Sequence, residues 1–310
     1  MSKKSSLPDT GERMIPEFHR GNLIYAEHLT RYQSAQALVK GKVVLDIASG
    51  SGYGAKLLAE TAAQVYGVDV SEDAVAYAQS HYGGKNIQYH VGNGERIPLK
   101  DNAVDVVVTF ETIEHIEDYN AFLREVKRVL KPDGLAIIST PNDLEFAEGN
   151  HFHLHEFEYK ELTSLLKKEY KHVKPYFQAT WKSVFIADEA SMSQEGLIDT
   201  QVVNLSPVAP EKYLYFFLLC SDRPITEEVE SLLALGGHYS DREVMAERAQ
   251  HQVELATFQG RVDSLQQTGD ALRVQIQTLQ DELTLIKSSR RYRLLTRLGE
   301  FKNKARRRSS

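Results

Sequence analysis

Cysteine is almost absent from the 310-residue chain, and long hydrophobic runs are missing altogether. The single cysteine, Cys220, excludes an internal disulfide and favours a reducing compartment. The longest apolar stretches have the length of a strand, so we expect neither a secretory signal nor a membrane-spanning helix. A hydrophobic content of 42% with 26% charged residues is enough for one sizeable core and an appendage. These features favour a cytoplasmic protein.

Acidic residues are scarce at the end of the chain. Residues 287–310 contain ten Lys or Arg and one acidic residue, Glu300, so this tail carries +9 while residues 1–286 carry −15. An acidic body binds nucleic acid poorly, and we predict no nucleic-acid partner. The basic tail is instead suited to binding an acidic surface.

The rest of the chain is organised around the stretch Val43 to Gly54, which reads Val-Val-Leu-Asp-Ile-Ala-Ser-Gly-Ser-Gly-Tyr-Gly. Apolar residues give way to small residues and then to a helix-compatible run, which predicts a strand, a tight loop and a helix. Small residues let a ligand approach the backbone at the carboxyl end of the strand, where open α/β sheets bind ligands. The candidate binding residues of this loop are Asp46, Ala48, Gly50 and Gly52.

An acidic residue also lies at the end of the second expected strand, 64–70. Asp69 follows Asp46 by 23 residues, where a carboxylate can bind both hydroxyls of a ribose. The loop lacks the order Gly-x-Gly-x-x-Gly and has no basic residue that could bind a pyrophosphate. The expected ligand is therefore a nucleoside without phosphates. Further strands at 87–91, 104–110 and 135–139 alternate with helices that begin near Ser71 and at Tyr119. This alternation predicts an α/β fold with a doubly wound sheet.

Five motifs between residues 41 and 142 resemble those of the class I S-adenosylmethionine-dependent methyltransferases. They are Leu45 to Gly54, Gly67-Val-Asp69, Asn93-Gly-Glu95-Arg-Ile-Pro98, Asp105-Val-Val-Val108 and Arg128-Val-Leu-Lys-Pro-Asp-Gly134. The resemblance implies a Rossmann-like methyltransferase sheet with S-adenosylmethionine as cofactor. It implies Asp46 and Gly50 near the methionine moiety, Asp69 on the ribose and Asn93 beside the adenine. Gly94 and Glu95 of the same motif are the remaining cofactor-binding candidates there.

Two segments before the first strand, Gly11-Glu-Arg and Glu27-His-x-x-Arg-Tyr32, resemble the leader of methyltransferases that act in bacterial O-antigen and surface-polysaccharide biosynthesis. The resemblance implies a leader that closes over the cofactor, with Arg31 paired to the methionine carboxylate. A solvated helix face is the alternative environment for Arg31.

Carboxylates and imidazoles gather after the fourth expected strand, in Glu111-Thr-Ile-Glu114-His115. If this segment is helical, Glu111, Glu114 and His115 project from one face. With His153 downstream, the motif resembles that of the ubiquinone-pathway O-methyltransferases and the small-RNA terminal 2'-O-methyltransferases. That resemblance implies that the four residues together bind one divalent metal ion, Mg or Mn. Imidazole ligands suit Mn better than Mg. Without a metal, His115 would act as a general base or pack, and Glu111 would orient the substrate.

The last third of the chain shows a heptad pattern. Apolar residues recur at alternating spacings of three and four, interrupted by one glycine, at Leu255, Phe258, Val262, Leu265, Gly269, Leu272, Ile276, Leu279, Leu283 and Ile286. The pattern predicts a parallel coiled coil of two or three chains, the alternative being one helix folded back on the domain. The tail after it resembles the stalk ends of bacterial glycan-assembly enzymes and has the composition of an interfacial helix, suited to an anionic membrane or to a glycosyltransferase partner.

The predicted organisation is a leader and cap at 1–40, a class I methyltransferase domain at 41–223 with an insertion at 188–211, a linker at 224–243, a coiled coil at 244–287 and a basic amphipathic tail at 288–310. The predicted function is O-methylation of a glycan or glycolipid at the inner face of the plasma membrane, where methylation would end chain growth. Two alternatives remain: O-methylation of a quinone precursor or other small diol, and a non-catalytic S-adenosylmethionine-binding subunit that recruits a glycosyltransferase.

Overall fold

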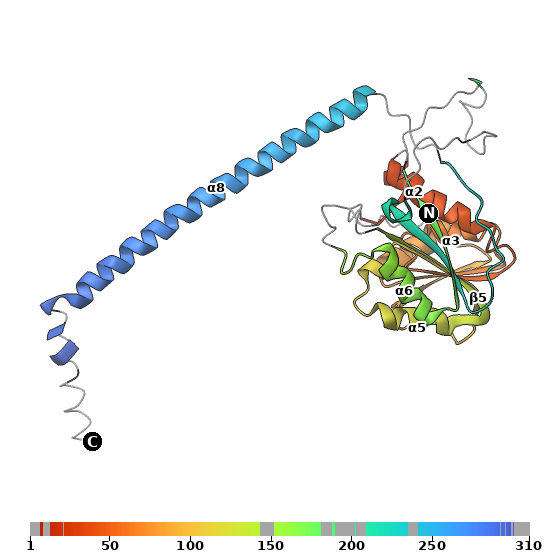
Figure 1. Ribbon diagram of the computed structural model, residues 1–310, viewed down its shortest axis with the longest axis horizontal. Coiled ribbons are helices and arrows are strands. Elements are labelled where there is room, and N and C mark those ends of the chain that lie inside the picture. The colour runs from red at the N-terminus through yellow and green to blue at the C-terminus, as the bar shows by residue number, and fades with distance from the viewer. Residues whose placement is uncertain are drawn as a thin grey trace, which may run out of the picture. The chain divides into compact units, whose positions relative to one another are not determined.

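The chain divides into two units, Met1–Gly237 and His238–Ser310, which are described separately. The computed structural model (Figure 1) describes residues 7–8, 13–20, 22–142, 152–180, 188–189, 202, 209–234, 241–291, 293–294, 296–298 and 300, with the backbone alone at 211, 241–259 and 263. Most of the predicted insertion at 188–211 lies outside these residues. So does the segment 182–187, for which the apolar pattern of the sequence also predicts a strand.

The first unit is built on one seven-stranded sheet of order β3-β2-β1-β4-β5-β7-β6. The strands are β1 Val43–Ile47, β2 Gln64–Asp69, β3 Ile87–Val91, β4 Val104–Phe110, β5 Leu130–Pro141, β6 His172–Gln178 and β7 Tyr215–Ser221. The first five strands pair in parallel, and β7 runs antiparallel to β5 and β6. The strand order reverses between β1 and β4, so a ligand-binding crevice is expected outside their carboxyl ends. The doubly wound α/β prediction is confirmed.

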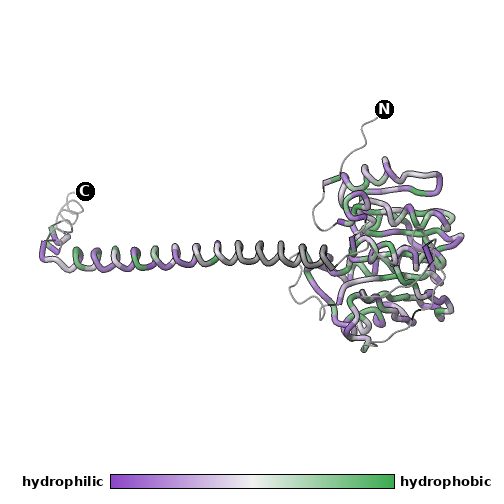
Figure 2. The backbone as a smooth tube through the Cα atoms, turned by 90° about the horizontal axis from the view of Figure 1, so that it is seen from above, coloured by the Kyte–Doolittle hydropathy of each residue, from purple (hydrophilic) through white to green (hydrophobic). Residues whose placement is uncertain are grey.

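Helices cover both faces of this sheet (Figure 1). They are α1 Pro16–His19, α2 Leu23–Gln36, α3 Tyr53–Leu58, α4 Glu72–Tyr82, α5 Tyr119–Val129 and α6 Tyr159–Glu169, with short 3-10 turns η1 Ile113–His115 and η3 Pro210–Lys212. Successive strand residues face opposite cores: Val107 packs with α5 and α6, whereas Val106 and Val108 pack with α2, α3 and α4. The strands are therefore apolar on both faces. Figure 2 shows hydrophobic stretches of the backbone tube inside the domain.

Local signals placed most elements correctly. Ser71 caps α4 as expected, because its Oγ accepts a hydrogen bond from the Ala74 N–H at 3.2 Å. The sequence Lys-Pro-Asp-Gly at 131–134 predicts a turn. The structure instead has a bulge within β5 there: Leu130 pairs with Val104 and Leu135 with Val106, while residues 131–133 are exposed. Proline tolerates this position because the bulge requires no ladder N–H from it.

The second unit contains one long helix, α8, from Asp241 to Ser288. Its large apolar side chains are exposed along the predicted seam, at Leu265 (72% exposed), Leu272 (53%), Ile276 (55%), Leu279 (58%), Leu283 (50%) and Ile286 (55%). Hydrophilic and hydrophobic residues alternate along the described part of this helix in Figure 2. Among the described residues, no helix is long and apolar enough to cross a membrane. The helix is confirmed, and the coiled coil stays a prediction.

Gly54 provides a test of how α2 packs on the first loop. A Cβ atom added to Gly54 would lie 2.0 Å from Cζ of Tyr32. We expect Gly54→Ala to lower the free energy of unfolding by about 1 to 3 kcal/mol, because the buried ring of Tyr32 must shift. Gly84→Ala is the control, since its added Cβ meets nothing closer than 3.7 Å. Urea unfolding in which both variants match the wild type would contradict this packing.

Candidate active site

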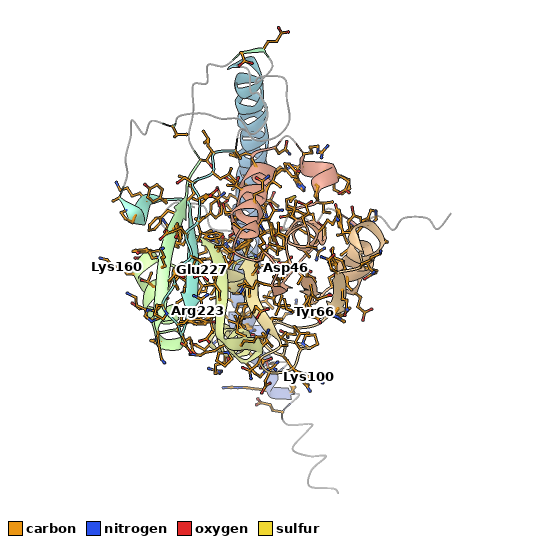
Figure 3. The ribbon with its side chains drawn as sticks, turned by 90° about the vertical axis from the view of Figure 1, so that its right-hand side faces the viewer. Asp46, Tyr66, Lys100, Lys160, Arg223 and Glu227 are labelled. Atoms are coloured by element: carbon orange, nitrogen blue, oxygen red, sulfur yellow. The ribbon has the colours of Figure 1, made fainter. Side chains whose placement is uncertain are left out.

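The first functional group at the carboxyl end of β1 is the fully buried carboxyl of Asp46. Figure 3 shows it among the strands near the centre of the domain. Tyr32 Oη donates to its Oδ1 at 3.2 Å, and its Oδ2 has no hydrogen-bond partner within the part of the chain that the structure describes. Burial raises the pKa of Asp46 to about 8. An unpaired buried oxygen is stabilised by a ligand that brings an N–H donor, and the ammonium group of S-adenosylmethionine fits that requirement.

The loop after β1 approaches its surroundings closely. Ala48, Gly50 and Gly52 all have positive φ angles, of 62°, 55° and 87°. A Cβ on Gly52 would lie 2.4 Å from Cβ of Ala78, so no larger residue fits there without a shift of α4. The loop therefore needs small residues, as the sequence pattern predicted.

Asp69, at the end of β2, is held by backbone from two loops. Its Oδ2 accepts from Gly50 N at 2.8 Å and its Oδ1 from Ser71 N at 2.9 Å. Arg13 Nη2 lies 3.9 Å from Oδ1, a contact with the leader that the sequence analysis did not assign. Each carboxylate oxygen can accept a further hydrogen bond, so the two ribose hydroxyls of a nucleoside match this group.

The motif expected beside the adenine forms a tight turn. Asn93 Oδ1 accepts from Glu95 N at 2.8 Å, and Glu95 Oε1 accepts from Asp118 N at 3.3 Å. A Cβ on Gly94 would lie 2.9 Å from Phe122 Cδ2. Asn93 thus keeps the turn in shape with the same oxygen that an aspartate would use.

Arg31 lies in a buried cluster at the carboxyl ends of β4 and β6 and the amino end of the antiparallel strand β7. It is 2% exposed, which excludes the solvated helix face considered above. Its Nη1 lies 3.2 Å from Glu111 Oε1 and donates to Gln178 Oε1 at 3.1 Å, and its guanidinium lies 4.5 Å from the centre of the Tyr215 ring. Its Nε and Nη2 have no hydrogen-bond partner among the described residues. Ser139 Oγ also donates to Glu111 Oε1, at 2.7 Å.

The helix face predicted for the motif after β4 does not form. Only Ile113–His115 is helical, as the 3-10 turn η1, and Glu111 precedes it with a φ angle of 51°. The shared face of Glu111, Glu114 and His115 was therefore a wrong prediction, because Glu111 turns back toward Arg31 and Ser139. A positive φ at a non-glycine residue costs free energy and is typical of functional sites.

Three of the four expected metal ligands do come together. The ligand atoms of Glu114, His115 and His153 lie within 4.8 Å of one another. Glu114 is fully buried, Thr140 Oγ1 donates to its Oε2 at 2.9 Å, and no described residue forms a hydrogen bond with its Oε1. Burial, followed by the charge of Glu111, raises the pKa of Glu114 well above its ordinary value. A cation would supply the partner that this carboxylate lacks.

Both imidazoles of this cluster are oriented through Nδ1. The Nδ1 of His115 lies 3.1 Å from the Phe152 carbonyl oxygen, and the Nδ1 of His153 lies 2.5 Å from Glu156 Oε1. Both oxygens can accept from an Nδ1–H group, and a neutral ring with its hydrogen on Nδ1 has its lone pair on Nε2. This is the tautomer that a metal ligand or a general base requires, fixed in the way usual for metal-binding histidines.

The segment after residue 151 is docked on η1 by its backbone. The Glu114 carbonyl accepts from Leu154 N at 2.8 Å and from His155 N at 3.1 Å. His155 itself pairs through Nε2 with Glu161 Oε1 at 2.8 Å, outside the cluster, and His151 lies outside the described residues. Because the docked backbone passes over η1, it places His153 beside His115, with the two ring centres 4.8 Å apart.

Sequence reasoning missed the residues that hold these groups in place. Thr140, Ser139, Gln178 and Tyr215 were not assigned, although polar residues at the ends of apolar strands were visible in the sequence. The parallel strands bring such residues to one edge of the sheet, which was the available signal.

Residues 45–138 match a family model described as a methyltransferase domain. They form a methyltransferase domain of the class I, S-adenosylmethionine-dependent type. The order of the seven strands and the position of the first loop, with Asp46 and Asp69 at the ends of β1 and β2, agree with that assignment. S-adenosylmethionine is the cofactor of such domains.

Curated relatives of this methyltransferase domain include a probable S-adenosylmethionine-dependent methyltransferase of Mycolicibacterium smegmatis. It is 41% identical over 168 residues, which are 53% of this chain and 65% of the relative. A ubiquinone biosynthesis O-methyltransferase of Azorhizobium caulinodans is 35% identical over 106 residues, 34% of this chain and 42% of that protein. The chain thus spans less than two thirds of the length of these relatives.

A solved structure shares the methyltransferase fold. A putative methyltransferase in complex with the Haloferax volcanii Trm112 methyltransferase activator has a TM-score of 0.50 at 19% identity, covering 66% of this chain and 93% of that one. At this identity the likeness supports the fold alone.

The ribose assignment of Asp69 can be tested by substitution. Asp69→Ala should weaken S-adenosylmethionine binding by on the order of 1 to 3 kcal/mol, because the ribose hydroxyls lose their acceptors. Asp73→Ala, an exposed change of the same charge in the first turn of α4, should leave the affinity unchanged. Calorimetry that gives equal affinities for Asp69→Ala and the wild type would remove the assignment.

Proposed function

We propose that the protein is an S-adenosylmethionine-dependent O-methyltransferase that acts on a sugar hydroxyl of a glycan or glycolipid. The observation that carries the O-methylation is the cluster of Glu114, His115 and His153, which follows β4 at the sheet edge where the cofactor is expected. In the reaction, the hydroxyl oxygen attacks the sulfonium methyl group, S-adenosylhomocysteine leaves, and the hydroxyl proton passes to a base. Alignment of the two reactants supplies much of the rate.

The residues of the cluster suit the deprotonation step. Glu114, His115 and His153 would hold a divalent metal, which would lower the pKa of a bound hydroxyl. Two imidazoles and one carboxylate suit manganese better than magnesium. If no metal is held there, His115 would instead take the proton at Nε2 as a general base, while the contact with Glu156 orients the ring of His153.

The choice of a glycan acceptor rests on sequence features. The leader segments that resemble those of surface-polysaccharide methyltransferases include Arg31 and Tyr32, and both residues reach the site. A small diol such as a quinone precursor is the second candidate, favoured by relatives named ubiquinone biosynthesis O-methyltransferase. A non-catalytic binding subunit is disfavoured, since it would need no cluster of oriented imidazoles.

The metal proposal predicts two results. Chelator should abolish methyl transfer while the protein still binds the cofactor, and Mn²⁺ should restore activity. His153→Ala should weaken Mn²⁺ binding more than about tenfold, whereas His155→Ala, whose ring pairs outside the cluster, should not. Full activity of metal-free protein would leave His115 as a simple base and end the metal proposal.

We also propose that α8 joins two or three copies of the chain as a parallel coiled coil. The exposed seam offers six large aliphatic residues on one stripe of the described helix, at Leu265, Leu272, Ile276, Leu279, Leu283 and Ile286. In a parallel pair, Glu282 of one copy faces Lys287 of the other at complementary flanking positions. The seam from 255 to 286 is about 48 Å long, so it would gather the basic tails at one end, where several weak membrane contacts act together.

Substitutions on and off the seam test this assembly. Ile276→Asp should give monomers, because it places a charge in the apolar interface, whereas Val274→Asp, exposed on another side of α8, should not. Light scattering after gel filtration measures the outcome.

Removal of residues 288–310 should release the protein from anionic vesicles in a salt-sensitive way and leave activity on a short acceptor unchanged. Equal vesicle binding by the truncated and full chains would contradict the membrane role.

A further inference from the structure

The ion pair between Arg31 and Glu111 is placed between two binding sites. Glu111 lies three residues before Glu114 of the histidine cluster, and after burial its negative charge is the next cause that raises the pKa of Glu114. On the other side, Arg31 is followed by Tyr32, whose hydroxyl donates to Asp46 at the end of β1, next to the cofactor loop. One buried pair therefore borders both the cluster and the expected cofactor site.

The two partners of the pair differ in what they have left to offer. Glu111 Oε1 already accepts a hydrogen bond from Ser139 and lies 3.2 Å from Arg31 Nη1, so this carboxylate forms an ion pair with the guanidinium. Arg31 is 2% exposed, and its Nε and Nη2 form no hydrogen bond with any residue that the structure describes. A buried guanidinium with unused donors has capacity for an anion, and its positive charge is unmet whenever Glu111 is drawn away.

We propose that the Arg31–Glu111 pair couples metal binding at the cluster to binding of the cofactor carboxylate. This inference rests on the metal site of the proposed function. Glu114, His115 and His153 would hold the cation, and its charge would attract the Glu111 carboxylate, three residues from Glu114, and weaken the hold of Glu111 on Arg31. Arg31 then offers its guanidinium to the methionine carboxylate. The coupling is reciprocal, so the cofactor also strengthens metal binding.

The strained backbone of Glu111 supports the proposal that this residue has two arrangements, one paired with Arg31 and one released from it. Its φ angle of 51° is costly for a residue with a side chain, and the pair with Arg31 helps to hold it there. Release from Arg31 would let the backbone relax, which lowers the free energy needed for the exchange. Gln178 and Tyr215 keep Arg31 in place meanwhile, so the guanidinium stays in position for the incoming carboxylate.

Two ligands that differ by one chemical group test the coupling without any substitution. S-adenosylhomocysteine carries the carboxylate, and methylthioadenosine has the same nucleoside but lacks the amino-acid moiety. Calorimetry on the full chain with and without Mn²⁺ should show S-adenosylhomocysteine binding about 5- to 150-fold tighter with the metal, the usual range for coupled sites. Methylthioadenosine should change less than about twofold. An equal effect on both ligands would overturn the role of the carboxylate.

Glu111→Gln provides the matched variant. The amide keeps the size of the side chain and can still accept from Ser139, but it loses the charge that the metal attracts. In this variant Mn²⁺ should still bind at the cluster, and S-adenosylhomocysteine affinity should become independent of the metal. If Mn²⁺ binds the wild type and leaves S-adenosylhomocysteine affinity unchanged, the coupling is wrong and the metal site stands. If Mn²⁺ does not bind the wild type, the metal site itself is wrong and the coupling falls with it.

Discussion

Burial of charge at the carboxyl edge of the sheet is the constraint on which the site depends. Arg31, Asp46 and Glu114 are each at most 2% exposed, and each has at least one polar atom that lacks a hydrogen-bond partner in the described part of the chain. Groups of this kind destabilise a fold unless ligands or ion pairs complete them. The large cores on both faces of the sheet supply the stability that offsets this cost. The edge is thus arranged for binding rather than for stability.

Helix α2 turns that edge into one site. Arg31 contacts residues of β6 and β7 and the carboxylate after β4, while Tyr32 packs over Gly54 and donates to Asp46 on β1. Neighbouring residues of one helix therefore fix groups that are far apart in sequence. Loss of α2 packing would disturb the cofactor loop and the chemistry after β4 together.

The sequence predicted what depends on local pattern and spacing. Alternating apolar runs with Ser71 as a cap gave the order of strands and helices, and the small residues from Ala48 to Gly52 gave the ligand loop. The partner of Arg31 could not be predicted, because three residues about 80 to 184 positions away decide it: Glu111, Gln178 and Tyr215. The helical spacing assumed for Glu111 failed for the same reason. A tertiary ion pair holds that residue in a conformation that no local propensity favours.

The histidine cluster depends on a backbone contact as much as on its side chains. Glu114 uses its carbonyl to accept two N–H groups of the segment that carries His153, and the same segment supplies the carbonyl that orients His115. Glu114 thus has two roles. Its backbone carbonyl holds the segment that carries His153 in place, and its side-chain carboxylate is itself a member of the cluster. Any change that displaces this segment would remove His153 from the cluster and free the ring of His115 to change tautomer, even with every ligand residue intact. The cluster is therefore a product of the docked loop, which explains why the spacing of ligands in the sequence describes it only in part.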